Sequence, residues 1–294
     1  MIIRVKFLLS IVLSFAFAVS FAFADDSDVP EPMIRIEYER ETVPVSLQTP
    51  ILRFEGSYKG EPIQIDLIGA IHFADSEYYA VLNRRFTQYD AVGVEMILPK
   101  GVPLSAVSQN NSFRTNKIKD PLDAFAAFQL WMGKTLQLTS QLDEIDYGSS
   151  NMVIADMDAE TLKNSIAESD EINDLLLDIF LAIFSQDDAK VQNGASYADA
   201  WAILFSRNRP RQLKRLFARL AAEEMDTKIP FEKSLIEKRN AAAFGRLMEQ
   251  IDAGKRNLAL FYGAAHLPGL AQKLENDLHL RPVGTEWLDA WSLK

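Results

Sequence analysis

The sequence predicts an α/β fold with a mixed, largely parallel central sheet, flanking helices and a large helical insertion. Short apolar runs at 63–68, 91–97 and 258–262 are typical of strands that are buried on both faces of a parallel sheet. A helical pattern through Tyr79, Leu82 and Phe86 lies between the first two runs, which is the spacing of a βαβ unit. From 120 to 251 the pattern is helical almost throughout.

The composition is that of a globular protein. Of the 294 residues, 48% are hydrophobic and 24% are charged, which excludes collagen-like, low-complexity and fully disordered chains. The chain has no Cys, so it forms no disulfide, thiolate zinc site or iron–sulfur cluster. Any metal must therefore bind His, carboxylate, amide or water ligands, and the chain has only three His, at positions 72, 266 and 279.

Residues 1–24 have the pattern of a secretory signal peptide. Arg4 and Lys6 precede an apolar run, and Ala22-Phe23-Ala24 offers small residues at a cleavage site. An uncleaved membrane anchor is the alternative, because the run is just long enough to span a bilayer. We expect a periplasmic or secreted protein that contacts the membrane only transiently, during export.

Removal of residues 1–24 would lower the formal net charge from −10 by two units, to −12. Such an acidic balance argues against nucleic acid as a partner, because it repels a phosphate backbone. The rest of the chain, 25–294, has a length that one large core with an insertion accommodates, so we expect a single domain.

The elements before the insertion follow from local patterns. Alternating apolar and polar residues predict strands at 34–39 and 51–58, and Lys59-Gly60 predicts the turn that leads into the strand at 63–68. Asp75 and Ser76 are candidate N-caps for a helix that continues through Tyr79, Leu82 and Phe86. The strand at 91–97 then completes the βαβ unit.

The helical insertion is expected over about 120–230, where Asp120-Pro121 is typical of a helix start. Helical patterns lie at 120–138, 158–167, 171–185, 196–206, 210–224 and 231–251. After the strand at 258–262, Pro268 is placed to open a helix through Leu274, and 281–287 predicts a closing strand.

Two of the three histidines end the same four-residue pattern. Gly69-Ala70-Ile71-His72 and Gly263-Ala264-Ala265-His266 each follow a predicted strand and precede a helix. Ligands of open α/β sheets bind beyond the carboxyl ends of the strands, so we expect both imidazoles in one site. Gly69 and Gly263 would bring main-chain N–H groups close to a bound cofactor or ligand.

Glu95 occupies the corresponding place on a third predicted strand, directly after its apolar residues Ala91 to Val94. Two imidazoles and a carboxylate match a facial metal site for Mn, Co, Zn or Fe, with His72, Glu95 and His266 as ligands. Such an ion would activate water for the hydrolysis of an amide or an ester. Glu95 could instead serve as a general base, or form a structural ion pair.

Arg239 and Asn240 lie on the helix predicted at 231–251. There, Arg could stabilise a developing oxyanion or hold a carboxylate, and Asn could donate to the same oxygen. Charged residues on a helix otherwise usually face water. His279 stands in a polar segment and is predicted to lie on the surface.

Taken together, these motifs resemble the TraB/PrgY/Tiki superfamily, in its bacterial GumN-like branch. The resemblance rests on the two Gly-x-x-His motifs, Val-Gly-Val-Glu95, Arg239-Asn240 and the run from Tyr262 to Leu270, which occur in the family's order over 69–270. It implies an α/β core related to the erythromycin-esterase and ChaN-like proteins, with a metal-dependent hydrolase site.

Carried over residue by residue, the resemblance makes His72 and His266 the motif histidines, Glu95 the acid at the strand end, and Arg239 with Asn240 the helical pair. The leading hypothesis is an exported metal-dependent hydrolase of peptidase type that cleaves a peptide or a small ester or amide. Its predicted catalytic residues are Glu95, Arg239 and Asn240. Two alternatives stay open: a non-catalytic metal- or haem-binding periplasmic protein, and a peptide-binding module on the same fold.

Overall fold

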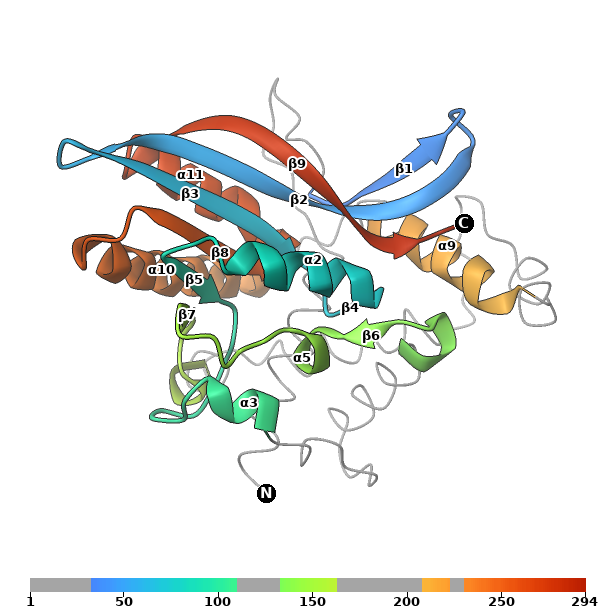
Figure 1. The fold of residues 1–294 in the computed structure, drawn as a ribbon, viewed down its shortest axis with the longest axis horizontal. Coiled ribbons are helices and arrows are strands. Elements are labelled where there is room, and N and C mark those ends of the chain that lie inside the picture. The colour runs from blue at the N-terminus through green and yellow to red at the C-terminus, as the bar shows by residue number, and fades with distance from the viewer. Residues whose placement is uncertain (1–32, 110–132, 163–207, 223–229) are drawn as a thin grey trace.

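A computed structural model describes residues 33–109, 133–162, 208–222 and 230–294 of the chain (Figure 1). Its strands are β1 Arg35–Glu39, β2 Val43–Tyr58, β3 Glu61–Ala70, β4 Phe73–Ala74, β5 Ala91–Val94, β6 Thr139–Ser140, β7 Met152–Ile154, β8 Asn257–Gly263 and β9 Arg281–Ser292. Its helices are α2 Ser76–Phe86, α3 Ser105–Gln109, α5 Gln141–Glu144, α9 Arg209–Ala222, α10 Pro230–Asp252, the short 3-10 helix η2 Ala264–His266 and α11 Leu267–Asn276. Each helix within these ranges is too short or too polar to cross a bilayer.

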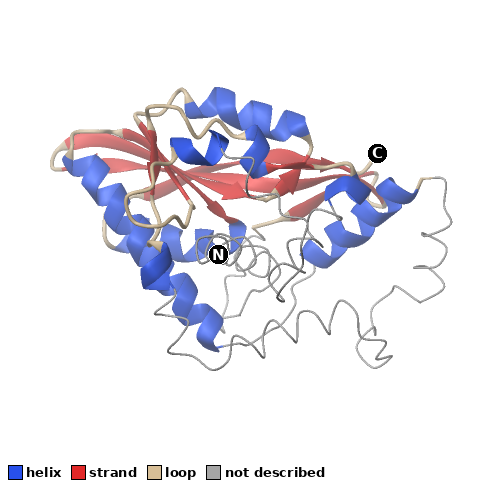
Figure 2. Cartoon of the chain, turned by 90° about the horizontal axis from the view of Figure 1, so that it is seen from below, coloured by secondary structure: helices blue, strands red, loops and turns tan. Residues whose placement is uncertain are grey.

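A mixed seven-stranded sheet forms the centre of the fold, with helices on both of its faces (Figure 2). The strand order is β1-β2-β3-β8-β5-β7, and β9 pairs with β2. β3, β8, β5 and β7 run parallel, whereas β2 is antiparallel to β1, β3 and β9. The predicted α/β class, with a mixed and largely parallel central sheet, is therefore confirmed.

Most predicted strands are present, although β5 ends at Val94, short of the predicted end at 97, and β2 is longer than expected. It begins at Val43 and contains Pro44 and Pro50, which weaken a strand pattern because proline lacks the N–H of a sheet ladder. Lys59 and Gly60 form the predicted turn, with φ of 51° and 84°. Two consecutive left-handed residues are typical of a type I′ hairpin, whose twist suits the strands that it joins.

The β3-α2-β5 succession confirms the predicted alternation of strand, helix and strand, but β3 and β5 are not neighbours. β8 lies between them and is parallel to both. Residues 258–262 of β8 are all buried, and alternate side chains enter the hydrophobic clusters on opposite faces of the sheet. This burial on two faces explains why the run is continuously apolar.

The described part of the predicted insertion differs from the expectation. Residues 139–154 contain the two-residue strand β6, the four-residue helix α5 and the strand β7, so this stretch is not continuously helical. α9 and α10 agree with the helices predicted at 210–224 and 231–251. The predictions at 1–24, 120–138, 158–167, 171–185 and 196–206 lie wholly or partly outside the described residues.

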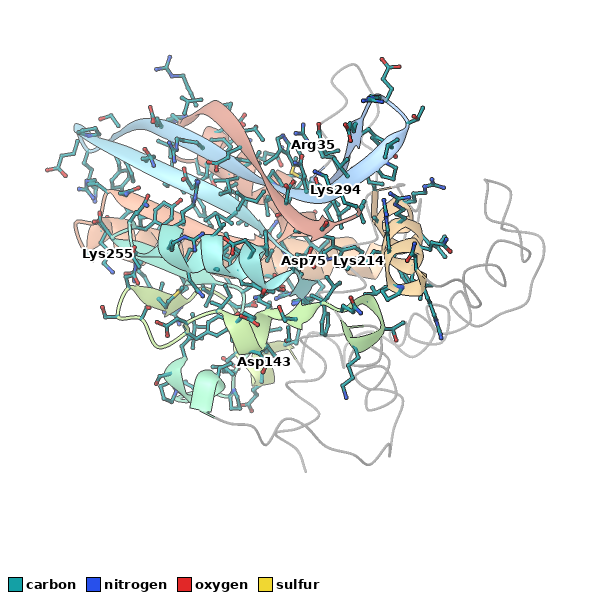
Figure 3. The ribbon with its side chains drawn as sticks, turned by 45° about the vertical axis from the view of Figure 1, so that its right-hand side comes forward. Arg35, Asp75, Asp143, Lys214, Lys255 and Lys294 are labelled. Carbon is teal, nitrogen blue, oxygen red and sulfur yellow. The ribbon has the colours of Figure 1, made fainter. Side chains whose placement is uncertain are left out.

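Asp75 occupies the N-cap position of α2, as predicted, but its side chain makes no capping hydrogen bond. Its carboxylate instead accepts from Lys214 Nζ on α9 at 2.7 Å and from the main-chain N–H of Ser292 in β9 at 2.5 Å. Figure 3 shows Asp75 and Lys214 side by side between α2 and α9. This carboxylate therefore joins three elements that are distant in the chain.

Candidate functional site

The carboxyl ends of β3, β8 and β5 meet at one edge of the sheet. Ala70 pairs with Gly263, and Val94 pairs with Phe261. The main-chain N–H of Glu95 continues this ladder by donating to the carbonyl of Phe261 at 3.0 Å. The predicted convergence of these strand ends is therefore present.

Glu95 is held on both carboxylate oxygens. Oε2 accepts the main-chain N–H of Gly263 at 2.6 Å, and Oε1 accepts Nη2 of Arg239 at 2.6 Å. Arg239 comes from α10 and its side chain is 0% exposed. A guanidinium can be buried in this way only when carboxylates neutralise it. Arg239 thus points into the protein and does not lie on a solvated helix face.

Asp156 is the second carboxylate of this cluster, and sequence reasoning missed it. It accepts from Arg239 Nε at 3.2 Å and from Nη2 at 2.6 Å, and it also accepts the main-chain N–H of Met157. Its position follows from β7, because 152–155 is an apolar run that ends in an acid, as β5 ends at Glu95. This resemblance to the β5 end is the signal that could have found it.

His266 is 1% exposed and is held by Asn240. The Asn240 side chain donates Nδ2–H to the carbonyl of His266 at 3.2 Å, and its Oδ1 lies 2.7 Å from Nδ1 of the ring. Nδ1 therefore carries the proton, and Nε2 presents its lone pair to Nη1 of Arg239 at 3.4 Å. Burial lowers the pKa of His266 to about 3, so the ring is neutral at pH 7.

His72 is the more accessible of the two motif histidines. It is half-buried, and its carbonyl accepts the main-chain N–H of Gln141 at 2.8 Å. Burial lowers the pKa of His72, whereas the negative charge of Glu95 opposes that change. The ring is therefore neutral at pH 7 and can accept a proton.

The buried charges stabilise one another. Burial by itself would raise the pKa of Glu95, but Arg239, the two histidines and the N–H of Gly263 hold it well below its usual range. Burial raises the pKa of Asp156, and Arg239 opposes this rise. Burial likewise works against the charged form of Arg239, but Asp156 and Glu95 raise its pKa above the ordinary value. The cluster therefore holds an ionised Glu95 and a permanently charged guanidinium.

The position of Arg239 opposes a divalent ion in this arrangement. Glu95 Oε1 and His266 Nε2 are 3.8 Å apart, but the Arg239 guanidinium contacts both atoms, and its positive charge would repel the ion. Among the described residues, no group of three His, Asp or Glu side chains has the spacing of a metal centre. The metal site at His72, Glu95 and His266 therefore stays a prediction.

Both motif glycines lie in closely packed surroundings. A Cβ at Gly69 would lie 2.9 Å from Cδ of Pro50, and a Cβ at Gly263 would lie 3.0 Å from Oε2 of Glu95. The N–H of Gly263 binds Glu95, so it is already used within the protein. Their predicted contact with a cofactor stays a prediction.

Comparison with known proteins identified no relative of this chain. A scan against protein-family models gave no match, and searches of curated proteins and of solved structures gave none either. The resemblance to the TraB/PrgY/Tiki superfamily therefore rests on the motifs in the sequence.

Proposed function

We propose that this chain is an exported hydrolase that cleaves ester or amide bonds in a peptide or a small molecule, with His72 as the general base. One observation carries the proposal. A neutral, half-buried imidazole stands at the carboxyl ends of parallel strands, within the field of the fully paired Glu95. Such sheet edges are where α/β proteins bind their ligands.

His72 is better suited to accept a proton than Glu95. The depressed pKa of Glu95 makes its carboxylate a weak base at neutral pH, whereas a neutral imidazole accepts a proton from water readily. The negative charge of Glu95 favours the protonated form of His72. Glu95 therefore stabilises the imidazolium that forms during the reaction, as the acid of a hydrolase triad does.

The reaction proceeds in two steps. His72 takes a proton from a water molecule while the water oxygen bonds to the carbonyl carbon, which gives a tetrahedral oxyanion. The imidazolium then returns the proton to the leaving oxygen or nitrogen as its bond to carbon breaks. Arg239 and Asn240 are buried and act through Glu95 and His266, so we assign them to positioning.

A metal-dependent form of the same reaction is the second proposal, and the arrangement of His266 favours it. Its Nδ1–H is fixed by Asn240, which is the support that metal-binding histidines commonly receive. His72, Glu95 and His266 would then hold Mn, Co, Zn or Fe, and Arg239 would have to move away from His266.

The test is turnover of a panel of chromogenic esters and fluorogenic peptide amides by the purified protein, with His72→Ala as the decisive variant. We expect kcat to fall by about 10²-fold or more, the usual contribution of a general base. His279→Ala, at an exposed histidine, is the matched control and should keep the parent rate. Absence of turnover over the whole panel, or full turnover by His72→Ala, would refute the proposal.

Metal content separates the two forms of the reaction. The first form predicts that the rate survives dialysis against EDTA and that the active protein carries no stoichiometric transition metal. One equivalent of Mn, Co, Zn or Fe, together with EDTA-sensitive turnover, would establish the metal-dependent form instead. A spectrum with a Soret band after haem addition, without turnover, would favour the haem-binding alternative.

The proposal includes export and the helical insertion at about 120–230. α9 lies within that range and supports the insertion, and the pattern of residues 1–24 supports export. The N-terminal sequence of the protein recovered from periplasm or medium is the direct measurement. Cleavage predicts a mature chain that begins at Asp25, and retention of residues 1–24 would indicate an anchor.

A further inference from the structure

A small second sheet places Gln141 against His72. β4 and β6 pair antiparallel, with Phe73 opposite Ser140. The next pair in this register is His72 and Gln141, and the main-chain N–H of Gln141 donates to the carbonyl of His72 at 2.8 Å. The backbone of the candidate general base is therefore fixed by a residue about 70 positions further along the chain.

The orientation of the Gln141 amide is also fixed. Gln141 is 3% exposed, and its Nε2–H donates to the hydroxyl of Tyr147 at 2.8 Å. Because the NH₂ group faces Tyr147, Oε1 is directed to the other side. Ser140 caps α5 by accepting the N–H of Leu142 at 3.2 Å, which holds the backbone at Gln141 in place.

The amide oxygen of Gln141 is buried and makes no hydrogen bond of ordinary geometry with any described residue. A buried polar atom without a partner costs about 1–3 kcal/mol, so such atoms are rare and need an explanation. The imidazole of His72 is the neighbour that can satisfy it. Gln141 raises the pKa of His72, which is the effect of an acceptor that faces a ring N–H.

We propose that Gln141 is a positioning residue whose Oε1 accepts the ring N–H of His72 and thereby fixes one tautomer of the imidazole. The other ring nitrogen then presents its lone pair to the water that is to be deprotonated. The catalytic meaning of this contact rests on the proposed function, whereas the contact itself does not. Fixing the tautomer matters because a neutral imidazole accepts a proton only at the nitrogen that lacks one.

The test is long-range ¹H–¹⁵N spectroscopy of protein labelled in histidine, in which only three residues contribute. His72→Ala assigns the signals of His72. We expect a single tautomer of His72 in the parent protein and a mixture of both tautomers in Gln141→Leu. Gln88→Leu, at an exposed glutamine, is the matched control and should leave the His72 signals unchanged.

Two further variants distinguish loss of the hydrogen-bond acceptor from a folding defect in Gln141→Leu. Gln141→Glu keeps the acceptor and should retain one tautomer. Tyr147→Phe keeps the shape of the ring but removes the hydrogen-bond partner of Gln141 Nε2. The Gln141 amide can then rotate by 180°, so we expect a partial mixture of the two His72 tautomers. Both tautomers in the parent, or a single tautomer in a folded Gln141→Leu, would overturn the inference.

Kinetics link the contact to the reaction. Gln141→Leu should lower kcat by about tenfold with little change in KM, because substrate binding is untouched while the base is misoriented. Failure of the two proposals can be told apart. If Gln141→Leu changes the tautomer of His72 but the parent protein turns over no substrate, the proposed function alone is refuted. If His72→Ala abolishes turnover but Gln141→Leu leaves the tautomer of His72 unchanged, only the role of Gln141 is refuted.

Discussion

The two Gly-x-x-His motifs have the same pattern and opposite environments. After β3, the chain bends at His72 before it enters β4, and His72 remains half-buried beside Gln141. After β8, the chain turns at once into η2 and α11, and His266 becomes one of the least exposed polar residues described. The same motif therefore places one histidine, His72, where solvent can reach it and the other, His266, within the buried cluster.

The register of β3 and β8 explains part of this difference. Ala70 pairs with Gly263, so the second motif begins one residue further along the sheet than the first. The neighbours then differ for each glycine. Gly69 packs against Pro50 of β2, whereas Gly263 lies against the Glu95 carboxylate. Gly69 therefore allows close packing within the sheet, and Gly263 allows close approach of the Glu95 carboxylate.

Among the variants that test the buried cluster around His266, Arg239→Met should lower the stability of the protein most. Glu95 and Asp156 would lose their common cation in the interior, and removal of one partner from a buried ion pair typically costs about 3–5 kcal/mol. The free energy of unfolding in urea measures the loss. Arg246→Met, at an exposed position of the same helix, is the control and should change stability little. An equal effect of both variants would contradict the buried cluster.

The histidines themselves should differ in the same assay. His266→Ala leaves Asn240 Oδ1 buried without its partner and opens a cavity, for a loss of about 2–4 kcal/mol. His72→Ala also removes the partner that we propose for Gln141 Oε1, but its position is half-buried and water can replace part of the ring, so it should cost less, about 1–2 kcal/mol. The comparison would fail if His72→Ala proved the more destabilising of the two.

The glycines sharpen the contrast at a smaller scale. Gly69→Ala forces a methyl group against the ring and carbonyl of Pro50, which are rigid, so we expect a loss of about 1–3 kcal/mol. In Gly263→Ala the methyl group meets the Glu95 carboxylate, which can shift. The thermal unfolding midpoint should therefore fall less in Gly263→Ala than in Gly69→Ala. Gly245→Ala, inside α10 with open space around it, should raise stability by about 0.5–1 kcal/mol. A larger loss in Gly263→Ala than in Gly69→Ala would reverse this assignment.

Acid should weaken the fold through His266. Its pKa is about 3 in the folded chain, whereas an exposed imidazole has a pKa of 6.5, so the unfolded chain binds more protons between these limits. Stability is then fully present above pH 6.5 and falls toward pH 3, at up to about 1.4 kcal/mol per pH unit. The lowered pKa values of His72 and, in stronger acid, Glu95 act in the same direction.

Urea midpoints at pH 7, 6 and 5 measure this slope. His266→Gln should flatten it, and the exposed His279→Gln should keep the slope of the parent. A slope that is identical in the parent and in His266→Gln would show that the ring is not held neutral by burial.

The sequence predicts those parts of the site that depend on parallel strand ends. Apolar runs locate β3, β5 and β8, and the parallel arrangement then requires that Glu95 and His266 lie near one another. Nothing in the local pattern shows that β8 is inserted between β3 and β5, because strand order depends on contacts between distant segments.

The missed residues come directly after, or shortly after, strands that are too short for periodicity to find. β7 has three residues and β6 has two, so neither gave a strand pattern, and Asp156 and Gln141 were not connected to the site. The burial of Arg239 was equally hidden. The sequence pattern of α10 cannot distinguish a paired interior guanidinium from a solvated one, since the carboxylates that neutralise Arg239 follow strands that are distant in the sequence.

The long strand β2 has a consequence for how the chain matures. One of its edges pairs with β1 and β3. The other edge pairs, within the described ranges, with β9 alone, whose Asp289 binds Ser46 across 243 positions of sequence. Until β9 has been synthesised and has docked, that edge offers open backbone groups to any passing strand. A chaperone that shields residues 46–55 during this interval would protect the newly made polypeptide from aggregation.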